Sequence, residues 1–191
     1  MQSIMKGINY DKTEAEADDL IDDLGVKNFP LNCFEIAELL GIKMHAYSEF
    51  PEEERQFIIS KYQEGFSLFN NNCFHIYYND SLDYNRTKFT VWHEIGHIQL
   101  GHFDSDNKIS QKQEEEANHF AAYLMAPLSM IYKLNLEDPQ KIAEIFEISI
   151  DLACNAYTHY TRAFRYTRIK DRILNGRLAK ILVYMPKETV A

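Results

Sequence analysis

The chain has 191 residues, of which 46% are hydrophobic and 13% aromatic, so it can form one domain with a substantial core. This apolar content excludes intrinsic disorder as a general description of the chain. The net charge of -9 argues against a protein that coats nucleic acid or an anionic membrane, because both functions need a basic surface.

The first half of the sequence predicts two helices followed by short strands. One helix is predicted over 11–24, and a second follows Pro30 with Asn32 as its N-cap. Short apolar runs predict strands at 42–47, 56–62, 66–69 and 73–78. Gly65 suits a hairpin turn between the second and third of these runs, and together they predict a small, antiparallel sheet.

The rest of the chain has the pattern of helices. They are predicted from Asp83 or Asn85 to Leu100 and over 110–125, 139–146 and 149–173, with a possible last strand at 179–184. The predicted fold class is therefore α+β. We expect a core over 1–135 and a helical C-terminal subdomain over 136–191 that packs on it.

The sequence shows no sign of membrane insertion, secretion or disulfide bonding. A membrane-spanning helix needs about 20 mostly apolar residues, and polar residues interrupt the longest candidate, 117–132. Cys33, Cys73 and Cys154 lie far apart, which is not the spacing of a disulfide framework or a zinc knuckle. We expect a cytoplasmic protein with three free, buried thiols and no membrane association. Residues 139–162 loosely resemble a helix-turn-helix, but the acidic charge favours packing on the core over direct nucleic acid binding.

The motif H-E-x-x-H occurs once, from His93 to His97, inside a predicted helix. Residues four apart lie on one face of a helix, so the two histidines can offer their imidazoles to one metal ion. Glu94 can then act as a general base on a water molecule whose pKa Zn²⁺ lowers to about 7. The alternative is a chance match on an amphipathic helix, and a third ligand would decide between the two interpretations.

Two places could supply that third ligand. One is His102, but a third histidine in the pattern H-E-x-x-H-x-x-G-x-x-H would need glycine and histidine where Leu100 and Phe103 stand. We therefore expect His102 to cap the helix or lie at the surface. The other is the acidic run on the next helix, where Glu114 and Asn118 share a face. Glu114 could bind the metal and Asn118 could hydrogen-bond a ligand imidazole, unless the glutamates are simply solvated or compensate the helix dipole.

The stretches KFTVWHEIGHIQLGH and EEEANHFAAYLMAP resemble the ImmA/IrrE family of zinc-dependent peptidases, found in bacteria, phages and mobile elements. The family pattern is F-T-x-x-H-E-x-x-H-x-x-L followed by E-x-E-A-N-x-F-A-x-x-L-L-M-P. The matching residues are Phe89, Thr90, His93, Glu94, Gly96, His97 and Leu100, then Glu114, Glu116, Ala117, Asn118, Phe120, Ala121, Leu124 and Pro127. The sequence departs from the pattern in L-M-A-P, where L-L-M-P is usual. The specific resemblance covers about 89–127.

The resemblance implies a zincin-like core that holds one Zn²⁺ per chain through His93, His97 and Glu114, with Glu94 as the general base. It also implies an endopeptidase whose protein substrate is a helix-turn-helix repressor or an antitoxin, and whose action derepresses a regulon or a mobile element. The alternative is a non-catalytic regulatory protein that binds and sequesters its partner.

Two further features concern the chemistry of cleavage. His119, His159 and Tyr160 are candidates to stabilise an oxyanion, but each is better interpreted as a structural residue, and none is assigned. If the predicted strand 73–78 lies at a sheet edge, a substrate could add to it as an extra strand.

Overall fold

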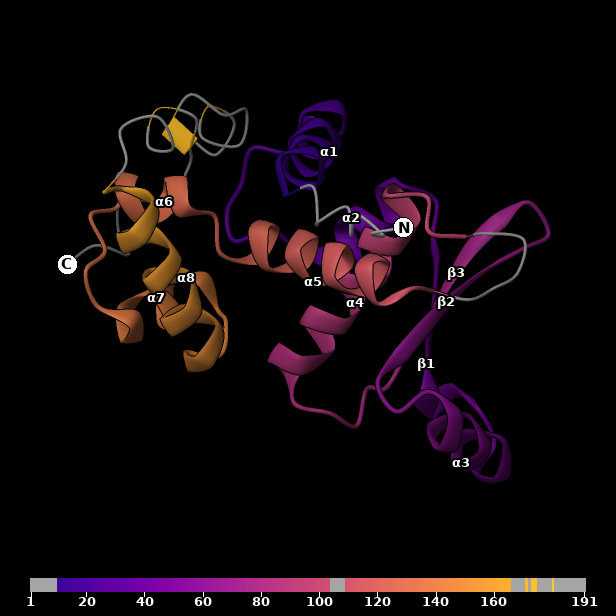
Figure 1. Cartoon of the computed structure of the whole chain (residues 1–191). Coiled ribbons are helices and arrows are strands. Elements are labelled where there is room, and N and C mark those ends of the chain that lie inside the picture. Colours follow the sequence, from indigo (N-terminus) through magenta and orange to yellow (C-terminus); the bar gives the residue numbers. More distant parts are fainter. Residues whose placement is uncertain (1–9, 104–108, 166–170, 172, 175–179, 181–191) are drawn as a thin grey trace, which may run out of the picture.

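The computed structural model describes residues 10–103 and 109–165, with 171, 173, 174 and 180 (Figure 1). In chain order the elements are α1 (Tyr10–Asp23), α2 (Cys33–Leu39), β1 (Lys43–Ala46), a 3₁₀ turn (Tyr47–Glu49), α3 (Glu52–Lys61), β2 (Gly65–Asn70), β3 (Cys73–Tyr78), α4 (Tyr84–Gln99), α5 (Gln111–Met125), α6 (Leu128–Lys133), α7 (Pro139–Phe146) and α8 (Ile150–Ala163). The predicted α+β class is confirmed. The predicted strand 179–184 and most of the helix beyond 165 lie outside the described residues.

The three strands form a mixed sheet in the order β1-β3-β2. The hairpin expected about Gly65, between 56–62 and 66–69, was wrong, because Gly65 is the first residue of β2 and the antiparallel hairpin joins β2 to β3. β1 runs parallel to β3, so the prediction of a fully antiparallel sheet was wrong as well. A parallel pair needs a crossover of a dozen or more residues, and the segment from the 3₁₀ turn to β2 supplies it. Because β3 is the central strand, the prediction that it could be an edge open to a substrate was also wrong. Among the described strands, the one that lies beside α4 and at an edge of the sheet is β2.

The segment predicted as a strand at 56–62 is largely the helix α3. Its first turn carries Glu52, Glu53 and Glu54, and its last turn carries Lys61, charges that favour a helix at each end. The apolar run that suggested a strand is instead half-buried or exposed on this helix, which lies at one end of the sheet (Figure 1). Local charge at the helix ends therefore outweighed the short apolar pattern.

Helix α4 lies between the sheet and α5, and α1 packs on α5. The pairs His93–Asn118 and His97–Glu114 show that α4 and α5 run antiparallel. Gly96 permits their close approach, since a Cβ at this position would lie 3.1 Å from the Phe120 ring and 3.3 Å from the carbonyl oxygen of Ala117. The two helices that carry the predicted site residues are thus in direct contact.

The C-terminal helices α6, α7 and α8 gather at the end of the molecule opposite the sheet (Figure 1). The buried Lys88 of α4 ties this group to the core, because its Nζ donates to the carbonyl oxygen of Glu147, 2.9 Å away, in the turn between α7 and α8. The division into a core and a subdomain at 135/136 stays a prediction. No helix within the described ranges is long and apolar enough to cross a membrane.

Only one of the three cysteines is buried as expected. Cys33 is 1% exposed, Cys73 is half-buried and Cys154 is exposed, so the prediction of three buried thiols was wrong for Cys73 and Cys154. Burial raises the pKa of the Cys33 thiol to about 12, which leaves very little of the reactive thiolate.

Cys154 is therefore expected to react readily with a thiol reagent in the folded protein at pH 8, and Cys33 on the order of 10³-fold more slowly. Mass spectrometry of the modified peptides over time measures both rates. Cys154→Ser should remove the fastest modification. Rapid labelling of Cys33 before the protein unfolds would contradict its burial beside α4.

Candidate metal centre

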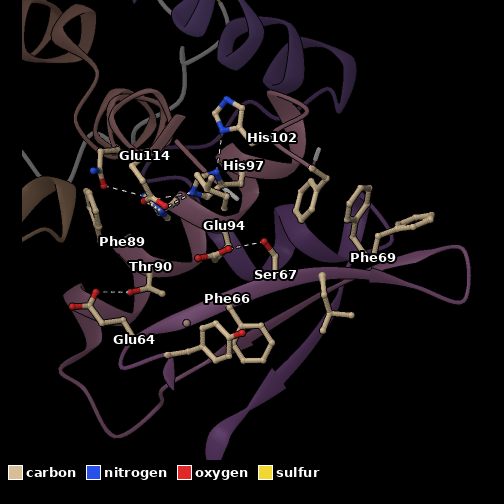
Figure 2. Close-up of a pocket in the computed structure, with 18 of the residues that line it drawn as sticks. Glu64, Phe66, Ser67, Phe69, Phe89, Thr90, Glu94, His97, His102 and Glu114 are labelled. Atoms are coloured by element: carbon tan, nitrogen blue, oxygen red, sulfur yellow. Dashed lines mark hydrogen bonds and ion pairs between the residues drawn. The ribbon is translucent and has the colours of Figure 1, made fainter. Parts of the chain in front are cut away.

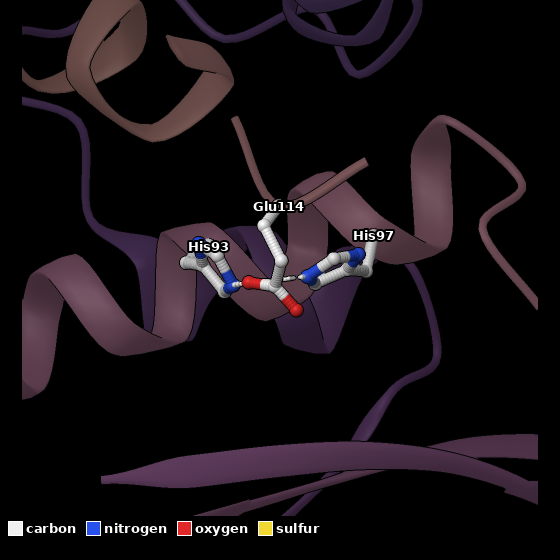
Figure 3. Close-up of side chains that lie close together, drawn as sticks. All are labelled: His93, His97 and Glu114. Carbon is white, nitrogen blue, oxygen red and sulfur yellow. Dashed lines mark hydrogen bonds and ion pairs between the residues drawn. The ribbon is translucent and has the colours of Figure 1, made fainter. Parts of the chain in front are cut away.

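Three side chains from α4 and α5 converge on one point (Figure 3). Each of His93, His97 and Glu114 offers a ligand atom, and these atoms all lie within 4.8 Å of one another. The Nε2 atoms of the two histidines are 2.9 Å apart, and Glu114 Oε2 lies 3.2 Å from His93 Nε2 and 3.8 Å from His97 Nε2. The structure thus brings together the three residues that the sequence suggested as ligands.

The helix caps set the position of these residues. Asp83 caps α4 by accepting hydrogen bonds from the backbone N–H groups of Asn85 and Arg86. Ser110 and Gln113 form a reciprocal capping box at the start of α5, one residue before Glu114. Each helix therefore begins at a defined residue, which fixes the face on which its candidate ligands lie.

Asn118 orients His93 as the sequence predicted. Its Oδ1 lies 3.0 Å from His93 Nδ1. Because an amide oxygen can only accept, Nδ1 carries the proton and Nε2 has a free lone pair that faces Glu114. Burial lowers the pKa of His93, and it lowers the pKa of His97 to about 3, so both imidazoles are neutral at pH 7. Neutral imidazole is the form that binds metals.

The donor set fits a divalent metal ion. The bare Nε2 of His93 and the Glu114 carboxylate both accept, so a positive centre between them is needed to make their close approach favourable. Two imidazoles and a carboxylate, with a remaining position open to a cavity, are typical of a catalytic metal site. The three residues are therefore a possible metal site.

Glu94 is buried next to the candidate ligands and faces the sheet. Ser67 of β2 donates a hydrogen bond from Oγ to Glu94 Oε2 over 2.5 Å (Figure 2). Burial raises the pKa of Glu94 to about 7, within the range in which a carboxyl group exchanges protons near neutral pH. Ser67 was not predicted from the sequence, since nothing in the local pattern connects a strand serine with a glutamate 27 residues away.

His102 does not lie at the surface, although its backbone N–H helps to cap the end of α4, as the sequence suggested. It is 6% exposed, and its Nδ1 lies 2.9 Å from Nδ1 of His97. Gly101 adopts a φ of +68° after the end of α4, and the backbone N–H of His102 then donates to the carbonyl oxygen of His97 over 3.0 Å. This reversal turns the His102 ring back onto the helix that it follows.

A cavity of about 1110 Å³ opens over Glu94 and the three candidate ligands. Its walls come from β2, β3, α4, the start of α5 and the segments flanking them, and aromatic rings line much of it (Figure 2). The aromatic and aliphatic lining residues are Tyr62, Phe66, Leu68, Phe69, Phe74, Phe89, Phe103 and Ile109. The unassigned oxyanion candidates lie elsewhere among the described residues: none lines this cavity, and His119 instead contacts Glu14 of α1 at 3.2 Å.

Gly65 allows β2 to approach α4 closely enough for Ser67 to reach Glu94. A Cβ at this position would lie 2.6 Å from Thr90 Cγ2 and 2.9 Å from the carbonyl oxygen of Tyr77. Gly65→Ala is therefore expected to lower the free energy of unfolding by about 1–3 kcal/mol, the usual cost of overpacking. Urea denaturation measures the change. Adding Thr90→Ser, which removes Cγ2, should recover part of the loss, and an unchanged stability in Gly65→Ala would contradict the contact.

Comparison with known proteins agrees with this geometry. The family model described as the IrrE N-terminal-like domain, a peptidase family, matches residues 60–158, more than half of the chain. The match includes β2, β3, α4 and α5, and hence Glu94 and all three candidate ligands. No curated protein matches the chain. The chain belongs to the IrrE N-terminal-like family of metallopeptidases.

Proposed function

We propose that the protein is a zinc-dependent endopeptidase that holds one Zn²⁺ through His93, His97 and Glu114. The observation that carries this proposal is the convergence of these side chains within 4.8 Å, next to the buried Glu94 and open to the cavity. Two histidines and one glutamate are a donor set of catalytic zinc in hydrolases. Membership of a metallopeptidase family supports the same chemistry.

Zn²⁺ bound at this site would polarise the scissile carbonyl group and acidify water. The protein supplies the proton transfers. Ser67 engages Oε2 of Glu94, which leaves Oε1 to take a proton from the attacking water and deliver it to the leaving amine. The raised pKa of Glu94 suits both steps, because the same carboxyl group must gain and lose a proton near neutral pH.

The cavity suits a segment of polypeptide as the substrate. It runs along β2, which is an edge strand and can pair with an extended peptide through its free backbone groups. We propose a protein substrate in the cytoplasm, namely a helix-turn-helix repressor or an antitoxin. DNA-binding proteins carry basic surfaces, and the net charge of -9 on this chain would favour an encounter with one.

The metal content of the purified protein tests this proposal first. After the protein is stripped and offered a limited mixture of divalent ions, we expect about one Zn²⁺ per chain, measured by elemental mass spectrometry. Retention of no metal would contradict the peptidase and favour the alternative, a protein that only binds its partner. Retention of a different ion would contradict the zinc assignment alone.

A further inference from the structure

His102 and Glu116 lie in line behind His97, on the side of its ring opposite the candidate metal centre. The Nδ1 atoms of His97 and His102 are 2.9 Å apart, and His102 Nε2 lies 3.5 Å from Glu116 Oε2. The side chain of His102 is 5% exposed and that of Glu116 is 15% exposed, while Lys112 Nζ lies 3.4 Å from the other oxygen of Glu116. The contacts form a continuous series from Glu116 on α5, through His102 in the turn after α4, to the candidate ligand His97.

The chemistry of the groups determines which one donates and which one accepts in each of these hydrogen bonds. A carboxylate only accepts, so Glu116 places the proton of a neutral His102 on Nε2. The bare Nδ1 of His102 can then only accept, and it takes the hydrogen of Nδ1 on His97. A neutral His97 has no second proton, and its Nε2 presents a free lone pair to His93 and Glu114.

The reverse hydrogen-bond direction, in which His102 donates from Nδ1 to His97, is unfavourable both at Glu116 and at the metal centre. If His102 donated from Nδ1, its bare Nε2 would face the Glu116 carboxylate, and two acceptors would lie together in a nearly buried place. His97 would then carry its proton on Nε2 and point it at the metal centre. Glu116 therefore decides, through His102, which nitrogen of His97 is free.

The two candidate histidine ligands are thus held by different groups. His93 donates from Nδ1 directly to the amide oxygen of Asn118, a neighbour across the helix pair. His97 instead donates from Nδ1 to the imidazole of His102, and His102 donates in turn to the carboxylate of Glu116. A hydrogen-bonded carboxylate behind a ligand histidine fixes the orientation of the ring and raises its basicity toward the metal.

We propose that His102 and Glu116 are positioning residues that fix the tautomer and orientation of His97, so that its Nε2 is free to bind the metal ion. This inference rests on the proposed metal site, but it concerns a property of the metal-free protein as well. In this role both residues act through His97 and not directly on the metal ion or the reacting atoms.

Four variants test the inference by Zn²⁺ affinity, measured by competition with a chromogenic chelator. Glu116→Ala and His102→Leu should weaken binding by about 10- to 100-fold, the usual cost of removing an outer hydrogen-bond partner. His102→Asn should recover most of the affinity lost in His102→Leu, because its amide oxygen accepts from Nδ1 as Asn118 does for His93. Glu115→Ala is the matched control, an exposed glutamate on the same helix, and should bind as the wild type does.

Nitrogen-15 NMR of histidine-labelled, metal-free protein reads the tautomer independently of metal binding and of cleavage. We expect the His97 proton on Nδ1 in the wild type and in His102→Asn, and a shift toward Nε2 in His102→Leu. A wild-type His97 protonated on Nε2 would overturn the inference, as would His102→Leu and Glu116→Ala proteins that bind Zn²⁺ like the wild type. A wild type that binds no Zn²⁺ would instead contradict the proposed metal site, while the tautomer would still decide the hydrogen-bond direction. If His102→Leu fails to fold, the Zn²⁺ affinity of Glu116→Ala tests the inference in its place.

Discussion

Glu94→Gln is expected to abolish peptide-bond cleavage and to leave the fold and the metal content unchanged. The substitution keeps the size of the side chain and an oxygen that can accept from Ser67 Oγ. It removes the group that takes a proton from water and returns it to the leaving amine, an effect worth about 10²- to 10⁴-fold in rate. Glu94 is not one of the three converging ligand groups, so metal binding should remain.

A library of peptides derived from a bacterial proteome provides the measurement, because the cleavage site in the natural substrate is unknown. Mass spectrometry should find new peptide termini with the zinc-loaded wild type and none above background with Glu94→Gln or with chelator present. Ser67→Ala, which removes the hydrogen bond to Oε2, should cleave the same peptides more slowly. Equal cleavage by Glu94→Gln and the wild type would remove Glu94 from the mechanism. Partner regulation in cells that survives this substitution would favour a binding protein over a peptidase.

Glu114→Ala is expected to weaken Zn²⁺ binding on the order of 10³-fold. This is more than the 10- to 100-fold cost typical of removing a residue that hydrogen-bonds to a metal ligand. The carboxylate of Glu114 lies 3.2 Å and 3.8 Å from the two histidine Nε2 atoms and is the acidic group in the candidate centre. Its loss removes one of three ligands and the negative charge that partly neutralises the cation. Chelator competition measures the change.

Glu115→Ala is the matched control for Glu114→Ala. Glu115 is the next residue on α5, but its side chain is exposed and accepts a hydrogen bond from Gln111 instead of facing the centre. Its substitution should change the zinc affinity by less than about 2-fold, as expected of an exposed charge remote from the metal. Equal losses in the two variants would show that the carboxylate ligand has been chosen wrongly.

The sequence by itself determined the features that depend on spacing along one helix. His93 and His97 lie one turn apart, and so do Glu114 and Asn118, because 3.6 residues per turn bring residues four apart onto one face. The two helices also begin near the predicted residues, since N-capping by Asp83 and Ser110 is a local interaction between neighbours in the chain. The family resemblance depends on the same two segments, and the family model that matches residues 60–158 confirms it.

Only the tertiary structure decided which side chains from different segments meet. Ser67 reaches Glu94 because β2 pairs with β3 and packs against α4, and His102 meets Glu116 because the chain reverses at Gly101 between α4 and α5. The parallel pairing of β1 with β3 likewise depends on a long crossover that no short pattern specifies. Local periodicity follows from the geometry of the backbone, whereas contacts between distant segments follow from how whole elements bury their apolar faces against one another. The sequence therefore predicted the candidate ligands, the base and Asn118, and the packing supplied Ser67, His102 and Glu116 beside them.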